Sequence, residues 1–152
     1  MSFKASFMPL TADCVVVPID FSDASPQAVA AARSLADSPA SLHLIHVMQP
    51  LETMSPGFLM GNVTDDVRRQ RVTDALTAFA AEHGVTGATL AAAIGTPGLE
   101  IADYAKRVGA DLIVIPSHGY HGVKRLFLGS VAERVLRHAP CDVLVLRRSD
   151  AE

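Results

Sequence analysis

The residues best suited to chemistry lie in one glycine-bearing segment between an apolar run and a helical pattern. Residues 112–115 are apolar and rich in β-branched side chains, as in a buried strand, and glycines follow at positions 119, 122 and 129. Ser130 then opens a segment with apolar residues at helical spacing. A strand, a glycine loop and a helix N-terminus together present converging N–H groups and a positive dipole end. This arrangement predicts a phosphate-binding site.

The spacing of this segment differs from two common phosphate-binding motifs. A Walker loop needs GxxxxGK[ST] and a dinucleotide loop needs GxGxxG, and neither occurs in the chain. A local alternative stays open, because Ser130 and Glu133 form an S-x-x-E capping box that would occupy the serine oxygen. Capping leaves other N–H groups of the first turn free, so the two interpretations are partly compatible.

A polar residue, Asp20, directly follows the first apolar run, residues 14–19. Its carboxylate can accept hydrogen bonds from a ligand, although a turn or cap aspartate before the first helix is the alternative.

The histidines of the chain carry weaker signals. His118 can contact a phosphate or pack over its loop. Histidines 118 and 121 have no third ligand within sequence reach, so no metal site is predicted. His43 and His46 alternate with apolar residues, and we expect structural roles for both.

The elements that must position these residues alternate regularly along the chain. Apolar runs at 14–19, 42–47, 88–94, 112–115 and 143–146 are separated by helical patterns, which include 63–83 and 131–138. Thr96, Pro97 and Gly109 mark the ends of another helix. Uninterrupted apolar strands between helices predict a single doubly wound, Rossmann-like α/β domain with helices on both faces of a parallel sheet. Ligands bind beyond the carboxyl ends of such strands, where both candidate groups lie.

The composition narrows the class of protein. A length of 152 residues suits one domain, and the net charge of -3 does not indicate a nucleic-acid partner. No apolar stretch approaches the roughly 20 residues of a membrane span, and the N-terminal residues lack a signal-peptide core. The two cysteines form no CxxC pair. We therefore expect a cytoplasmic protein with neither a nucleic-acid nor a membrane partner.

Two motifs in the same order resemble those of the universal stress protein family. The family carries Gly-x2-Gly-x9-Gly-[Ser/Thr] after its fourth strand, and here Gly119 is followed by nine residues and Gly129-Ser130. Pro116 stands in place of the first glycine. Residues 15–22, VVVPIDFS, resemble the first strand and Pro-x-Asp-x-Ser turn of the family. The resemblance implies a domain at 13–148, with an N-terminal extension at 1–12 and a tail at 149–152.

The resemblance implies a five-stranded open sheet of order 3-2-1-4-5, which brings both motifs to one crevice. It also implies an adenine-nucleotide site for ATP, AMP or ADP, with Asp20 at the adenosine end. Any Mg²⁺ would be carried on the phosphates. Simple core packing is the alternative for the apolar members of the site. The site residues implied are Pro18, Ile19, Asp20, Leu42, Ile115, Pro116, His118, Gly119, Gly129, Ser130 and Val131.

The function implied is that of a stress-response or regulatory protein that acts through a ligand-dependent conformation or a partner. One alternative is a nucleotide-free dimeric interaction protein, because Pro116 removes an N–H and adds bulk where the family has glycine. Another is a slow Mg²⁺-dependent ATPase, although no catalytic base or arginine finger is evident. The run from Val143 to Leu146 contains no proline and, as an edge strand, would invite pairing. The resemblance implies a homodimer there; a strand covered by the chain's own termini is the alternative.

Overall fold

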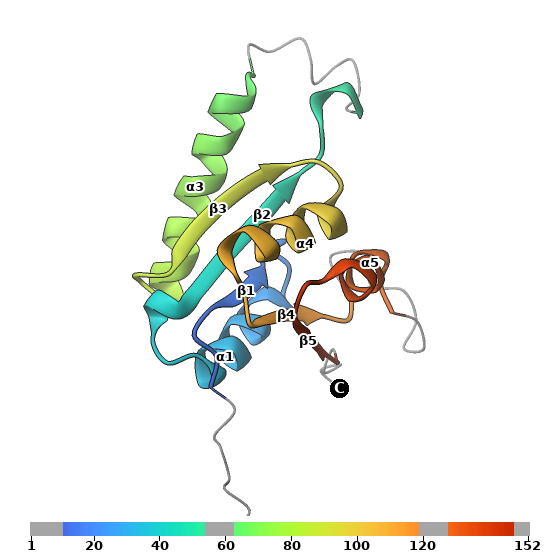
Figure 1. Ribbon diagram of the computed structural model, residues 1–152. Coiled ribbons are helices and arrows are strands. Elements are labelled where there is room, and N and C mark those ends of the chain that lie inside the picture. Colours follow the sequence, from blue (N-terminus) through green and yellow to red (C-terminus); the bar gives the residue numbers. More distant parts are fainter. Residues whose placement is uncertain (1–10, 54–62, 119–127, 148–152) are drawn as a thin grey trace, which may run out of the picture.

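The computed structural model describes residues 11–53, 63–118 and 128–147 (Figure 1). Predicted site residue Gly119, most of the glycine loop and the tail at 149–152 lie outside the described residues. The elements, with 3-10 turns at Pro39–Ser41 and Leu51–Thr53, are β1 (Val15–Pro18), α1 (Ser25–Leu35), β2 (Leu42–Met48), α3 (Asp65–Glu82), β3 (Thr89–Ile94), α4 (Pro97–Val108), β4 (Leu112–Pro116), α5 (Ser130–His138) and β5 (Asp142–Leu146).

The five strands form one parallel sheet in the order β3-β2-β1-β4-β5, which confirms the predicted topology. Val15 of β1 lies between Leu42 of β2 and Leu112 of β4. The strand order therefore reverses between β1 and β4. Both predicted motifs leave the sheet at the carboxyl ends of these two neighbours, the position where doubly wound folds bind ligands.

Apolar side chains of the strands alternate between the two faces of the sheet and pack against a pair of helices on each face. Val17 and Leu44 pack with residues of α1 and α3, among them Leu76. Val16 and Ile45 belong to a second cluster, with residues of α4 and α5. Figure 1 shows α3 running along β3 and β2, with α4 crossing on the other side. The core is thus a three-layer α/β structure, as the uninterrupted apolar strands predict.

Local signals account for several helix ends. Thr64 precedes α3 and its hydroxyl accepts from the Val67 N–H at 3.3 Å, as an N-cap should. Thr96 and Pro97 begin α4 as predicted, and Gly109 ends it with φ 66°. No helix within the described ranges is long and apolar enough to cross a membrane.

Candidate functional site

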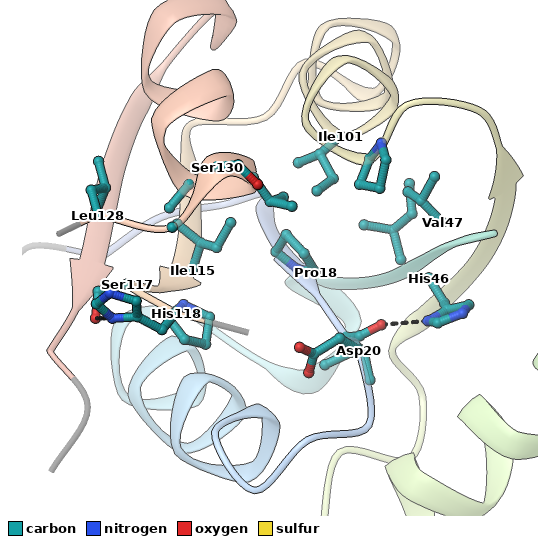
Figure 2. Close-up of a pocket in the computed structure, with 17 residues that line it drawn as sticks. Pro18, Asp20, His46, Val47, Ile101, Ile115, Ser117, His118, Leu128 and Ser130 are labelled. Atoms are coloured by element: carbon teal, nitrogen blue, oxygen red, sulfur yellow. Dashed lines mark hydrogen bonds between the residues drawn. The ribbon is translucent and has the colours of Figure 1, made fainter. Parts of the chain in front are cut away.

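A cavity of about 500 Å³ opens at the carboxyl ends of β1, β2 and β4, beneath the first turns of α4 and α5 (Figure 2). Its wall is mostly apolar, with a few polar groups at opposite ends, which is the usual composition of a small-molecule site. The lining residues are Pro18, Ile19, Asp20, Ile45, His46, Val47, Pro97, Ile101, Ile115, Pro116, Ser117, His118, Leu128, Gly129, Ser130, Val131 and Ala132.

Asp20 supplies an oriented carboxylate at one end of this cavity. Its Oδ1 accepts from the Ser22 N–H and from the Ser25 hydroxyl, both at 2.9 Å. Partial burial opposes ionisation, but the hydrogen bonds from Ser22 and Ser25 outweigh it and hold the pKa of Asp20 below its usual value. These bonds all fall on Oδ1, and Figure 2 shows the carboxylate directed into the cavity. Asp20 is thus a turn aspartate whose charged carboxylate also lines the cavity.

The N-terminus of α5 forms the opposite end of the cavity. Gly129 is the N-cap, and its own N–H donates to the Ser117 carbonyl at 2.7 Å. Ser130, Val131 and Ala132 are the first three helical residues, so their N–H groups have no acceptor within the helix. All three line the cavity. Their converging donors and the helix dipole favour an anion at this position.

The capping-box interpretation of Ser130 is wrong. The helix begins at Ser130 itself, and no side chain of the described residues caps it. Glu133 does not reach back to the start of the helix, because its carboxylate accepts from Arg137 at 2.7 Å instead. Within the described residues the Ser130 hydroxyl therefore has no capping role that would compete with a ligand.

The end of β4 forms the floor between these two poles. Ile115 and Pro116 both line the cavity, and Pro116 still pairs in register with Leu146 of β5. Beyond it, the Ser117 hydroxyl lies 3.1 Å from Nδ1 of His118. Nε2 of His118 is buried and has no hydrogen-bond partner among the residues that the structure describes. A buried, unsatisfied ring nitrogen at the cavity wall is a polar group that a ligand or water could satisfy.

Leu42 does not reach this site, which corrects its predicted place. It is the first residue of β2, is fully buried in the core and pairs with Val15. Since the strands are parallel, the amino end of β2 lies at the opposite end of the strands from the cavity. The carboxyl end of the same strand supplies Ile45, His46 and Val47 to the lining instead.

Several lining residues were not anticipated from the sequence. Pro97 and Ile101 come from α4, for which the sequence pattern predicts a helix but no part in the site. His46, expected to be structural, also reaches the cavity, and its Nδ1 lies 2.7 Å from the Ile19 carbonyl. A carbonyl can only accept, so Nδ1 must carry the proton. His46 and Val47 are the last two residues of the apolar run at 42–47. Because ligands bind at the carboxyl ends of parallel strands, the end of this run was the signal for both residues.

The described residues contain no group of three side chains suited to a metal ion. The titratable lining residues among them are Asp20, His46 and His118. The cavity therefore has a carboxylate acceptor at one end, an apolar middle and anion-binding N–H donors at the other end. A ligand with hydroxyl or amino groups, a flat apolar part and an anionic group matches this sequence of surfaces.

Comparisons with known proteins agree with the fold and with the motifs. A sequence model of the Universal stress protein family matches residues 12–147. Universal stress protein YxiE of Bacillus subtilis (strain 168) is 34% identical over 145 residues, which span 88% of this chain and 97% of that protein. The structure of universal stress protein UspA from Lactobacillus plantarum matches with a TM-score of 0.68 at 26% identity, over 89% of this chain and 98% of the other. A universal stress protein solved in complex with cAMP matches with a TM-score of 0.61 at 25% identity, over 91% and 99%.

Proposed function

This chain belongs to the universal stress protein family, and from that premise we propose that it binds an adenine nucleotide in the cavity between β1 and β4. We propose further that it is a cytoplasmic regulatory protein whose conformation or partner binding responds to that nucleotide. The related protein whose structure contains cAMP supports an adenine ligand. Asp20 would lie at the adenosine end, and the N–H groups of Ser130, Val131 and Ala132 would hold the phosphate.

One observation carries this proposal: a single cavity contains both an ionised acceptor and a helix N-terminus whose first N–H groups have no acceptor within the helix. A carboxylate favours neutral hydroxyl donors and repels an anion, whereas the start of α5 favours an anion. The two poles therefore orient a nucleotide in one direction, with its ribose toward Asp20 and its phosphate toward Ser130. Neither pole alone would distinguish a nucleotide from a simple phosphate or a simple polyol.

The main chain of Val47 supports adenine as the base. The Ile45 carbonyl accepts from Ile19, on the β1 side, and the Met48 carbonyl accepts from Gly95, on the β3 side. Since these directions alternate along a strand, the N–H and carbonyl of Val47 point toward β1. β1 has already ended at Pro18, so both groups face the cavity edge. A donor beside an acceptor complements the N1 and amino group of adenine, whereas guanine presents the reverse order.

Pro116 bears on which part of a nucleotide binds tightly. Proline offers no N–H to the ligand and brings a ring where the family has glycine. Pro116 lines the same cavity as Asp20 and the start of α5. The phosphate donors of α5 do not depend on it. We propose that Pro116 weakens contacts to the sugar and leaves the phosphate contacts intact; a Mg²⁺ ion, if one accompanies ATP, would be held by the phosphates.

We also propose that the protein forms a homodimer through β5. This strand lies at one edge of the sheet, and its residues Val143, Leu144, Val145 and Leu146 are only half-buried. An apolar edge without proline pairs readily with a second copy, and a two-fold axis would close the assembly. Sedimentation equilibrium at micromolar protein should give twice the chain mass; a monomeric mass would contradict the dimer.

Thermal unfolding with added nucleotides tests the nucleotide proposal. ATP, ADP, AMP and cAMP, each with and without Mg²⁺, should raise the melting temperature, while GTP should have little effect. A ligand present at 100 times its Kd adds roughly 2.7 kcal/mol to stability, a shift that is readily measured. No shift at millimolar nucleotide would contradict the proposal and favour the nucleotide-free dimer. Steady phosphate release from ATP that is lost in Asp20→Ala would instead favour the slow ATPase.

A further inference from the structure

Phe21 has a strained backbone at the edge of the candidate site. Its φ is 60°, the left-handed region, and it is the only non-glycine residue with positive φ among those the structure describes. A bulky residue rarely adopts this conformation, because its Cβ crowds the following carbonyl. Such strain persists only where surrounding contacts impose it, and it is commonest at functional sites.

Ring contacts on two sides hold the Phe21 side chain although it remains 40% exposed. Its ring centroid lies 5.1 Å from the His46 ring on β2 and 6.0 Å from the Phe79 ring on α3, in an edge-on arrangement. Phe79 is anchored in turn by the His83 ring at 4.3 Å. Phe21 therefore joins the end of β2 to the body of α3, and these contacts offset the cost of its backbone conformation.

The backbone reversal at Phe21 shapes the turn that presents Asp20. Ser22 N–H, on the far side of Phe21, turns back to donate to the Asp20 carboxylate at 2.9 Å. On the near side, the Ile19 carbonyl accepts from His46, the same ring that Phe21 contacts. The aromatic contacts and the hydrogen bonds thus fix both ends of the three-residue segment that carries Asp20.

We propose that Phe21 is a positioning residue: its ring, held between His46 and Phe79, keeps the Asp20 carboxylate directed into the cavity in the free protein. The part of this inference that concerns nucleotide affinity rests on the proposed function, and the part that concerns the Asp20 turn does not. Without the ring, the turn would have to be ordered when the ligand binds, and that ordering weakens affinity. An aromatic contact of this kind corresponds to a factor of about 2 to 10 in an equilibrium, so we expect nucleotide affinity to fall about tenfold.

Two variants of Phe21 separate the effect of the ring from that of the backbone conformation, and a third variant is the control. Phe21→Asn tolerates positive φ but removes the ring. Phe21→Trp keeps an aromatic ring and, since the chain contains no tryptophan, also adds a single fluorophore at the site. Val67→Asn is the control, because Val67 is similarly exposed at 38% and lies in the first turn of α3, outside the cavity lining. For each protein, the Asp20 pKa is measured by NMR of its carboxyl carbon without ligand, and the Kd for AMP by calorimetry.

The expected result is that Phe21→Asn raises the Asp20 pKa toward its ordinary value, because the bonds from Ser22 and Ser25 loosen, and weakens AMP binding about tenfold. Phe21→Trp and Val67→Asn should leave both quantities near wild type, and the emission of Phe21→Trp should change on AMP addition. An unchanged Asp20 pKa in Phe21→Asn overturns the inference, whatever the affinity. A raised Asp20 pKa in a protein whose wild type binds no nucleotide would refute the proposed function and uphold the positioning role.

Discussion

Replacing Gly129 with alanine adds one carbon atom at the start of α5, the end of the cavity where we propose that the phosphate binds. A Cβ at this position would lie 2.9 Å from the Ser117 carbonyl oxygen and 3.5 Å from the His118 Cα. The first distance is shorter than real Cβ contacts allow, and both neighbours are backbone atoms that no side-chain rotation can move. The φ of -63° and ψ of 154° at Gly129 suit alanine. The effect must therefore come from a displacement that separates the start of α5 from Ser117.

The magnitude follows from what that movement disrupts. Forcing one methyl group into a packed contact costs about 1–3 kcal/mol of stability. The same movement stretches the 2.7 Å hydrogen bond from Gly129 to Ser117 and shifts the donors of Ser130 and Val131. Losing one hydrogen bond to a charged phosphate costs about 1.5–3 kcal/mol. We therefore expect Gly129→Ala to weaken AMP binding at least tenfold, measured as a Kd by isothermal titration calorimetry.

A matched control separates lost stability from lost binding. Gly109 ends α4 with φ 66°, and a Cβ there would meet no atom within 4 Å from the described residues, its two chain neighbours aside. Gly109→Ala should destabilise the fold by about 1–2 kcal/mol through backbone strain alone. It lies outside the cavity lining, so its Kd should match wild type. Equal affinities in Gly129→Ala and wild type would refute the assignment of the phosphate to the start of α5.

Three further predictions concern the rest of the site and the core. Gly98→Ala would place a Cβ 2.6 Å from the Cβ of Arg134, so α5 should shift; we expect a loss of about 1–3 kcal/mol in denaturant unfolding and weaker AMP binding. Pro116→Gly should strengthen nucleotide binding several-fold in calorimetry, and unchanged affinity would show that the proline does not crowd the sugar. Burial lowers the pKa of the His43 ring below 6.5. The unfolded chain therefore binds a proton at His43 more readily than the folded chain does, and the free energy of unfolding should decrease as pH falls below about 6.5. His43→Gln should lose that part of the pH dependence in unfolding experiments at pH 7 and 5.5.

The sequence predicts the fold well because its local signals agree with one another. Apolar runs, helical spacing and the Thr96, Pro97 and Gly109 markers all favour the same alternation of strands and helices. The strand order came only from the resemblance, because periodicity records which residues are buried and not which strands are neighbours. The sequence predicts that both motifs begin at the carboxyl ends of strands, and β1 and β4 are neighbours in the parallel sheet.

The remaining site residues depend on contacts that local patterns do not specify. Leu42 and Val47 belong to the same apolar strand, and only the direction of that strand in the sheet decides which one lines the cavity. Ser130 and Glu133 match a capping box, yet the bond from Gly129 to Ser117 makes the glycine the N-cap. The positive φ of Phe21 lies within the local turn from Asp20 to Ser22, but the rings that hold its side chain come from β2 and α3.

Backbone amide NMR during a titration with AMP tests the central claim most directly. Nucleotide binding between β1 and β4 predicts chemical-shift changes that saturate together at Asp20, Val47, Ser130 and Val131, with Gly109 at the opposite end of the sheet unmoved. The shifts should be weaker or absent in Gly129→Ala. Saturating shifts confined to other parts of the chain, or no shifts at millimolar AMP, would contradict nucleotide binding at this site.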